Sequence, residues 1–107
     1  MPPEASSGEL DSLFLSRVRL GIMAALEGGD ELDFTFLKEA LETTDGNLGA
    51  HLRRLEEAGM IGSRKRFIAR RPNTSYRVTE RGRRAFEAYV RNLAHLLGLQ
   101  EGGQAKA

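Results

Sequence analysis

The sequence predicts an α+β fold that is mostly α-helical, and three stretches of different apolar spacing carry the prediction. From Leu10 to Leu55 the apolar residues recur at helical intervals, with a break at each of two short connecting segments. Past Gly59 the spacing changes to the alternation that is typical of strands, and past Thr79 it returns to helical intervals. A chain of 107 residues suits a single domain with one modest core.

The first part of the chain is predicted to contain two helical regions. Apolar residues across 10–26 fit either one bent helix or two short ones, the second capped by Ser16, and the glycine pair at 28–29 would end the region. Leu32 then lies in a short extended link. Asp33 can cap a further helix, because its carboxylate can accept from the unpaired amides of the first turn. The apolar stripe of that helix comprises Phe34, Leu37, Ala40 and Leu41.

The rest of the chain is organised around the stretch from Thr44 to Gly59. Thr44 can cap a helix there, and Gly59 can end it. One face carries an apolar stripe, and the other is small near its start and carries amide and guanidinium groups further on. Such a face suits a DNA major groove, since small residues permit close approach while Asn and Arg read bases. The apolar residues are Leu48, Leu52 and Leu55, and the outward residues are Gly46, Asn47, Ala50, Arg53 and Arg54.

Taken alone, this helix also fits an ordinary amphipathic helix with a solvated face. Arg53 and Arg54 could pair with glutamates one turn away instead of binding DNA. Asn47 could read a base or serve as a local partner of the helix cap. His51 falls at the edge of the apolar stripe and is interpreted as a partly buried structural residue, and His95 as a residue of the dimer surface or the solvent.

A basic β-hairpin is predicted after Gly59. Strands are expected at 60–68 and 74–78, with a turn at 70–73 because proline and asparagine together favour one. Arg70 and Arg71 at the expected tip have no acid near them in the sequence, which favours a phosphate or a minor groove as their partner. Arg64, Lys65 and Arg66 alternate sides of a strand, so about half of this group is expected to touch DNA.

The last helix is predicted to begin at Thr79 and to end at Gly98. Its apolar stripe runs for about five turns, which is longer than a core of this size needs. The excess is expected to pack against the same helix of a second copy, with help from three apolar residues near the N-terminus. The expected dimer residues are Leu10, Leu13, Phe14, Phe86, Tyr89, Val90, Leu93, Leu96 and Leu97.

The charges of the chain are segregated, although the net charge is only +1. Residues 1–45 hold ten acids and three bases, a net charge of −7, whereas residues 62–84 hold nine bases and one acid, a net charge of +8. A positive end of this density is typical of a protein that binds a polyanion, although basic clusters also occur as ordinary solvated surface.

Two adjacent helices followed by a two-stranded hairpin form a winged helix-turn-helix. Residues from about 16 to 97 resemble winged-helix transcriptional regulators of the MarR/ArsR type, especially a small single-domain bacterial and archaeal subgroup. The segments that carry the resemblance are SRVRLGIMAAL, LDFTFLKEAL, TDGNLGAHLRRLEEAGMI and KRFIARRPNTSYRVTERGRRAF.

The resemblance implies a homodimer whose recognition helix, about 44–59, enters the major groove of double-stranded DNA. It also implies that the wing, about 64–75, contacts the flanking backbone or minor groove. One departure is Gly49, where many relatives carry a serine that can donate to a phosphate or a base. The expected DNA-binding residues are Thr44, Gly46, Asn47, Ala50, Arg53, Arg54, Arg64, Arg66, Arg70, Arg71, Asn73 and Thr74.

Several classes of function are not expected. The chain has no cysteine, so it lacks disulfides and the thiolate sites that metal-sensing relatives use, and no cofactor or metal is predicted. It shows no nucleophile motif, phosphate loop or paired carboxylates, so no enzyme is expected. Without a signal peptide or an apolar run of membrane-spanning length, a cytoplasmic protein without a membrane partner is expected.

The sequence therefore predicts a winged-helix domain at 9–98 with N- and C-terminal dimerisation helices, preceded by a disordered lead at 1–8 and followed by a flexible tail at 99–107. Its expected function is that of a sequence-specific, dimeric DNA-binding transcriptional regulator whose small-molecule effector is unknown. Two alternatives stay open, a winged-helix module that binds another protein and a non-specific nucleic-acid binder.

Overall fold

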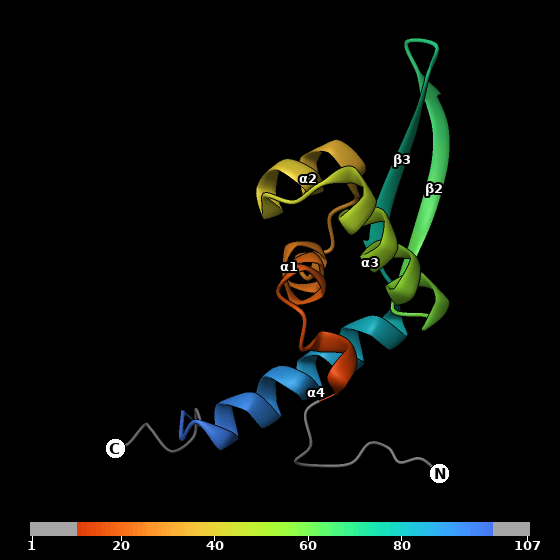
Figure 1. The fold of residues 1–107 in the computed structure, drawn as a ribbon. Helices are drawn as coiled ribbons and strands as arrows, with labels where there is room; N and C mark the ends of the chain where they lie inside the picture. The colour runs from red at the N-terminus through yellow and green to blue at the C-terminus, as the bar shows by residue number, and fades with distance from the viewer. Residues whose placement is uncertain (1–10, 100–107) are drawn as a thin grey trace.

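A computed structural model describes residues 11–99, so the predicted lead at 1–8 and nearly all of the predicted tail lie outside the described residues. A 3-10 helix, η1, precedes four α-helices and a small antiparallel sheet with the strand order β1-β3-β2 (Figure 1). The predicted fold, an α+β winged helix-turn-helix, is confirmed. The elements are η1 Ser12–Phe14, α1 Arg17–Leu26, β1 Leu32–Asp33, α2 Phe34–Leu41, α3 Asp45–Glu57, β2 Ile61–Ile68, β3 Arg71–Val78 and α4 Glu80–Leu96.

Each α-helix begins at the side chain that the sequence predicts as its cap. In every case the side-chain oxygen accepts a hydrogen bond from the amide three residues later, which satisfies one of the unpaired donors of the first turn. The break at Ser16 shows that the N-terminal region is two pieces, η1 and α1, instead of one bent helix. The caps are Ser16, Asp33, Thr44 and Thr79.

Glycine ends α3 as predicted and sets the direction of the wing. Gly59 has a φ of 80°, a left-handed conformation in which glycine has no steric penalty. Its amide donates to the Glu56 carbonyl, and the Met60 amide donates to the Leu55 carbonyl. This pair of bonds satisfies two carbonyls at the end of the helix and turns the chain directly into β2.

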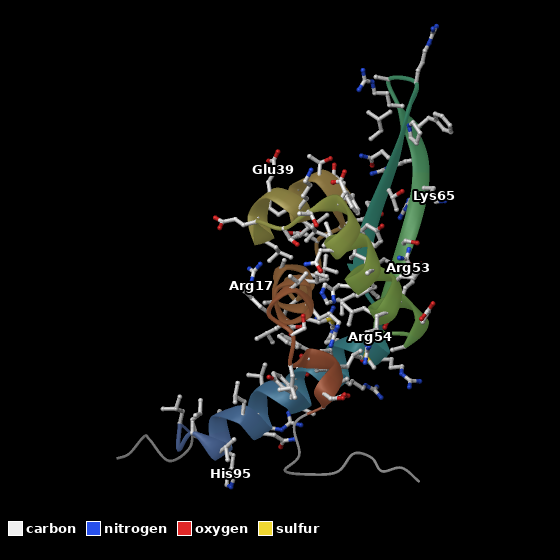
Figure 2. The ribbon with its side chains drawn as sticks, in the orientation of Figure 1. Arg17, Glu39, Arg53, Arg54, Lys65 and His95 are labelled. Carbon is white, nitrogen blue, oxygen red and sulfur yellow. The ribbon has the colours of Figure 1, made fainter. Side chains whose placement is uncertain are left out.

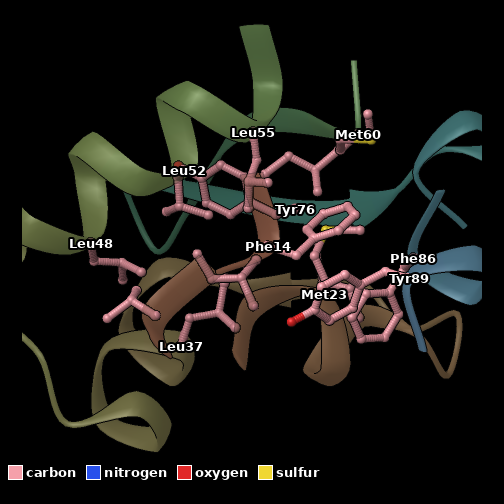
Figure 3. Close-up of a cluster of buried hydrophobic side chains, with 14 residues drawn as sticks. Phe14, Met23, Leu37, Leu48, Leu52, Leu55, Met60, Tyr76, Phe86 and Tyr89 are labelled. Carbon is pink, nitrogen blue, oxygen red and sulfur yellow. The ribbon is translucent and has the colours of Figure 1, made fainter. Parts of the chain in front are cut away.

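The core lies where α1 meets α3, the sheet and the start of α4 (Figure 3). Phe14 is fully buried and contacts Phe86 and Tyr89 edge-on, with ring centroids 5.7 and 5.4 Å apart. Such pairs add to the stabilisation from buried area. The other core residues are Val18, Ile22, Met23, Leu26, Leu37, Leu48, Leu52, Leu55, Met60, Ile61 and Tyr76.

The base of the wing is joined to α4 through the backbone carbonyl of Met60. The Thr79 amide donates to this carbonyl at 3.0 Å, and the Thr79 hydroxyl donates to the carbonyls of Gly59 and Met60 at 2.7 and 3.1 Å. A Cβ on Gly82 would lie 2.0 Å from the same Met60 oxygen. Only glycine lets α4 approach the carbonyl this closely, which explains why the T-E-R-G segment, residues 79–82, ends in glycine.

The predicted position of the hairpin turn is wrong. The sequence places the turn at 70–73, but the structure joins the strands through Ala69 and Arg70, and Pro72 lies in β3 opposite Phe67. A two-residue turn makes its flanking residues a hydrogen-bonded pair, so the next pair of the ladder is not hydrogen-bonded. Pro72 belongs to that second pair, in which no backbone amide donates across to β2, so the missing amide hydrogen of proline costs no hydrogen bond.

Gly82→Ala is expected to destabilise the fold by about 1–3 kcal/mol, because the methyl group would push α4 away from the Met60 carbonyl. Gly49→Ala is the matched control, since a Cβ there meets nothing within 4 Å and alanine stabilises a helix interior by roughly 0.5–1 kcal/mol. Urea unfolding of both variants measures the two effects, and a Gly82→Ala variant as stable as wild type would contradict this account of the junction.

Candidate nucleic-acid interface

The outward face of α3 carries exposed residues that lie outside the core. Thr44, Gly46, Ala50 and Arg53 are all exposed, as the sequence predicts for a recognition helix. A Cβ added to Gly46 or Gly49 would meet no atom of the chain within 4 Å. Since glycine in a helix interior costs roughly 0.5–1 kcal/mol relative to alanine, packing within the chain does not account for either glycine.

Arg53 and Arg54 lie on different sides of α3 (Figure 2). Arg53 lines a groove shared with β3, and its positive charge acts to lower the pKa of Tyr76 in that groove. Arg54 acts on Arg19 and on His51, whose pKa values it helps to lower. Neither guanidinium forms an ion pair with a residue in 11–99, so the alternative of pairing with Glu56 or Glu57 is absent from this structure.

Asn47 has a local partner in the structure. Its side-chain amide donates to the Thr43 hydroxyl at 2.7 Å, and its backbone amide donates to the Thr44 hydroxyl at 3.2 Å. The side chain therefore braces the start of α3, which is the local interpretation of this residue. Its exposed position leaves the second interpretation, base reading, as a prediction.

An open groove of about 530 Å³ separates α3 from the wing. The start of α2 contributes Phe34 and Thr35 to it, so three elements meet there. Burial raises the pKa of Tyr76, which lines the groove, and the nearby Glu56 carboxylate raises it further while Arg53 lowers it. Glu56 is itself held by the Ser63 hydroxyl, which donates to it at 2.6 Å. The remaining lining residues are Gly49, Leu52, Pro72, Asn73 and Thr74.

The two faces of the wing differ in their charge partners. Arg64 and Arg66 lie on the face opposite α3, since Ser63 and Tyr76 occupy the α3 side of the ladder. Glu31 lies on that opposite face and forms an ion pair with Arg64 at 3.1 Å. A hydrogen bond from the Ser75 hydroxyl, followed by the charges of Arg64, Arg66 and Arg77, holds the Glu31 pKa below its usual range.

Asn73 and Thr74 are half-buried beside the groove rather than fully exposed. The Asn73 side-chain amide donates to the carboxylate of Asp33 at 3.3 Å, the same side chain that caps α2. Asn73 therefore ties the wing to the start of α2. A role for these two residues in binding DNA stays a prediction.

The tip of the wing presents Arg70 and Arg71 in exposed positions. Ala69 and Arg70 both have left-handed backbones, with φ values of 54° and 68°. A turn of this kind favours Asn-Gly, and residues with a Cβ are strained in it by an amount on the order of 1 kcal/mol. The chain thus keeps an arginine at the outermost position although glycine there would stabilise the hairpin.

A contact that the sequence analysis missed connects α3 to the N-terminal segment through Arg19. Its Nε donates to the Leu13 carbonyl at 2.6 Å, and its Nη1 donates to Nδ1 of His51 at 2.9 Å. The interpretation of His51 as a partly buried structural residue is confirmed. No sequence signal could have found the pair, because Arg19 and His51 are 32 residues apart and only the packing of α1 on α3 brings them together.

The predicted dimer residues differ in how much surface they expose. Phe14, Phe86 and Tyr89 are buried in the core of the single chain, so they offer almost no surface to a second copy. Val90, Leu96 and Leu97 on α4 are exposed. Leu13 and Leu93 are half-buried against the core, and Leu10 lies outside the described residues.

The helix-turn-helix, the wing and the α3 face together define a known type of domain, and residues 18–97 match the winged helix DNA-binding domain. The chain belongs to this family. It is 42% identical over 84 residues to an uncharacterized protein of Methanocaldococcus jannaschii, an alignment that covers 78% of this chain and 91% of the relative.

Solved structures of winged-helix proteins agree with this assignment. A transcriptional regulator homologue from Pyrococcus horikoshii superposes with a TM-score of 0.76 and 31% identity, over 82% of this chain and 87% of that chain. The MepR–DNA complex of S. aureus shares the fold, with a TM-score of 0.64 and 19% identity over 80% of this chain and 70% of that chain. The resemblance to winged-helix transcriptional regulators is confirmed.

Two further findings concern the winged-helix domain at residues 11–99. None of its helices combines the length and the apolar content that crossing a bilayer requires. Among the same residues, the His, Asp and Glu side chains form no group of three or more that could hold a metal ion.

Stability is expected to decrease as the pH falls below about 6.5, the ordinary pKa of histidine. Burial, followed by the charges of Arg19 and Arg54, lowers the pKa of His51 in the folded chain. The folded protein therefore binds fewer protons than the unfolded chain in this range, and the contribution of neutral His51 is lost as the pH falls through its lowered pKa. His51→Gln, which keeps an acceptor without titrating, should flatten the dependence in urea unfolding between pH 5 and 7.5. Equal pH slopes for the two proteins would contradict this role of His51.

Proposed function

We propose that this winged-helix protein is a dimeric transcriptional regulator that binds a specific sequence of double-stranded DNA. The observation that carries the proposal is the wing. It projects beyond the helices (Figure 1), its residues 61–78 contain no acid, and a strained turn holds Arg70 at its outermost point. A protruding, purely basic hairpin beside a recognition helix suits the phosphate backbone of a duplex.

In this proposal α3 lies in the major groove. Gly46, Gly49 and Ala50 allow the backbone of the helix to approach the bases, and Arg53 and Arg54 supply the donors that read guanine or hold phosphates. Because Arg53 and Arg54 lie on different sides of the helix, each would reach a different position of the half-site. Thr44 and Asn47 stand at the start of α3, where backbone amides suit a phosphate.

Selection of bound duplexes from a random double-stranded library tests the proposal directly. We expect enrichment of a sequence with two related halves arranged as a palindrome, because a symmetric dimer presents two identical helices about 34 Å apart. Failure to enrich any sequence, with binding that ignores sequence, would favour the non-specific nucleic-acid binder instead. Failure to bind any duplex would favour the protein-binding module.

Arg53→Ala and Arg54→Ala are each expected to lose roughly 1–3 kcal/mol of binding free energy and to relax base preference at one position per half-site. Arg71→Ala is the contrast. It should weaken binding to specific and random duplexes alike, and it should reduce the slope of log K against log salt by about 0.9. Titrations on single-base variants of the selected site separate the two patterns. If both α3 variants discriminate among the bases as wild type does, α3 is not the element that reads them.

The exposed end of α4 is proposed as the dimer surface. Leu96 and Leu97 are 68% and 60% exposed, and with Val90 they form an apolar surface that water solvates poorly. A two-fold axis through this surface would cover the patches of both copies at once. One domain alone makes too few base contacts to select a site in a genome, so the dimer is part of the function.

Leu96→Glu with Leu97→Glu is expected to give a folded monomer that binds the palindrome no better than random DNA. Both side chains are exposed in the single chain, so the substitutions should leave its core and its circular dichroism unchanged. Phe36→Glu is the control, since Phe36 is 52% exposed on α2, away from this surface. Sedimentation should show a dimer for wild type and for the control. A monomeric wild type at micromolar concentration would refute the dimer and the palindrome with it.

A further inference from the structure

The wing carries a large apolar side chain where the strands have left the body of the domain. Phe67 is 74% exposed, and Pro72, also exposed, lies directly opposite it in the ladder. Beyond Ser63 every residue of β2 is exposed, so the aromatic ring contributes nothing to the core. A phenylalanine that lies outside the core, within so basic a segment, suits a partner that has an anionic surface and an apolar interior.

Strand alternation places Phe67 on the side of the wing that faces α3. Residues paired across an antiparallel ladder share a face, and so do residues two apart along a strand. Phe67 and Pro72 therefore share the face of Ser63, which binds Glu56 of α3, and of Tyr76, which packs in the core. Ile68, 50% exposed, lies on the opposite face.

The reach of the wing is comparable with the spacing of the grooves of a duplex. Phe67 lies four residues along β2 from Ser63, whose hydroxyl donates to Glu56 of α3, and this separation corresponds to about 13 Å at about 3.3 Å per residue. Half a turn of B-DNA is about 17 Å, and this is the spacing between a major groove and the next minor groove on the same side. A turn of two residues is narrow enough to approach a groove about 6 Å wide.

We propose that Phe67, braced by Pro72, is an apolar wedge that enters the minor groove beside the half-site and partly unstacks one base step. Arg70 and Arg71 hold the phosphates on either side of the entry point. Duplex DNA fits this surface better than an anionic membrane does, because the ring and the groove of α3 lie on one face of the wing. The inference rests on the proposed function and adds the wing as a second element that selects the DNA sequence.

The wedge would select DNA by its deformability. Pyrimidine–purine steps such as TA unstack at a low energetic cost, whereas A-tracts are stiff. Apolar side chains inserted from the minor groove kink the duplex at such steps. The protein should therefore favour a flexible step at a fixed distance outside each half-site, at a position where no side chain makes a hydrogen bond to a base.

The test uses the full chain and duplexes that carry the selected palindrome, with 2-aminopurine at each flanking step in turn. Wild type should raise the fluorescence at one step on each side, because unstacking removes quenching. It should also bind a site with a TA step there about tenfold more tightly than a site with an A-tract. Phe67→Ala should still bind the palindrome but lose both the fluorescence change and the preference for TA. Phe67→Leu should retain much of each.

Ile68→Ala is the matched control, since it removes an exposed apolar side chain from the other face of the same hairpin. It should behave as wild type in both measurements, and thermal unfolding should confirm that all three variants are folded. Equal fluorescence and equal step preference for wild type and Phe67→Ala would overturn the wedge and leave the proposed function intact. Absence of wild-type binding to any duplex, or tighter binding to phosphatidylserine vesicles than to DNA, would overturn both.

Discussion

The arrangement of this winged helix depends on the backbone carbonyl of Met60. The carbonyl follows the glycine that ends α3, it stands at the base of β2, and it accepts hydrogen bonds from the amide and the hydroxyl of Thr79 at the start of α4. Gly82 allows the first turn of α4 to press against it. One peptide group thus fixes the end of α3, the root of the wing and the start of α4, the helix proposed to form the dimer. A small shift there would move all three together, because the three elements meet at this peptide group.

The arginines on the wing face opposite α3 are arranged around the carboxylate of Glu31. Glu31 lies beside β3 on the face away from α3, where it accepts from Ser75 and pairs with Arg64. Its carboxylate offsets the repulsion among the arginines of that face and anchors the lower part of the hairpin. The tip has no such partner within residues 11–99, so its cations stay available to an external anion. The basic segment therefore has a lower part that is anchored by Glu31 and a tip whose arginines are exposed to solvent.

Arg19 gives α3 a polar connection to the N-terminal segment. It joins the Leu13 carbonyl of η1 to His51 of α3, and η1 in turn places Phe14 against Phe86 and Tyr89 of α4. The orientation of α3 is thereby linked to the same aromatic cluster that positions α4. In a dimer built on α4, this chain of contacts would relate the spacing of the two recognition helices to the packing of one chain.

The sequence by itself determined the order and type of the elements, the four helix caps, the glycine stops and the apolar stripe of α3. These depend on interactions within about four residues, such as a Thr44 hydroxyl and the Asn47 amide, so local chemistry is enough to find them. Only the tertiary structure decided that the hairpin turns at Ala69 and Arg70, because the ladder register, set by β2 and β1 together, allows Pro72 to remain in a strand. It also decided that Phe14, Phe86 and Tyr89 fill the core while Leu96 and Leu97 stay exposed. The same holds for two polar contacts, the ion pair of Arg64 with Glu31 and the hydrogen bond that His51 accepts from Arg19. Each of these depends on residues that are distant in the chain, and apolar spacing along one helix is the same whether the stripe covers its own core or a second copy.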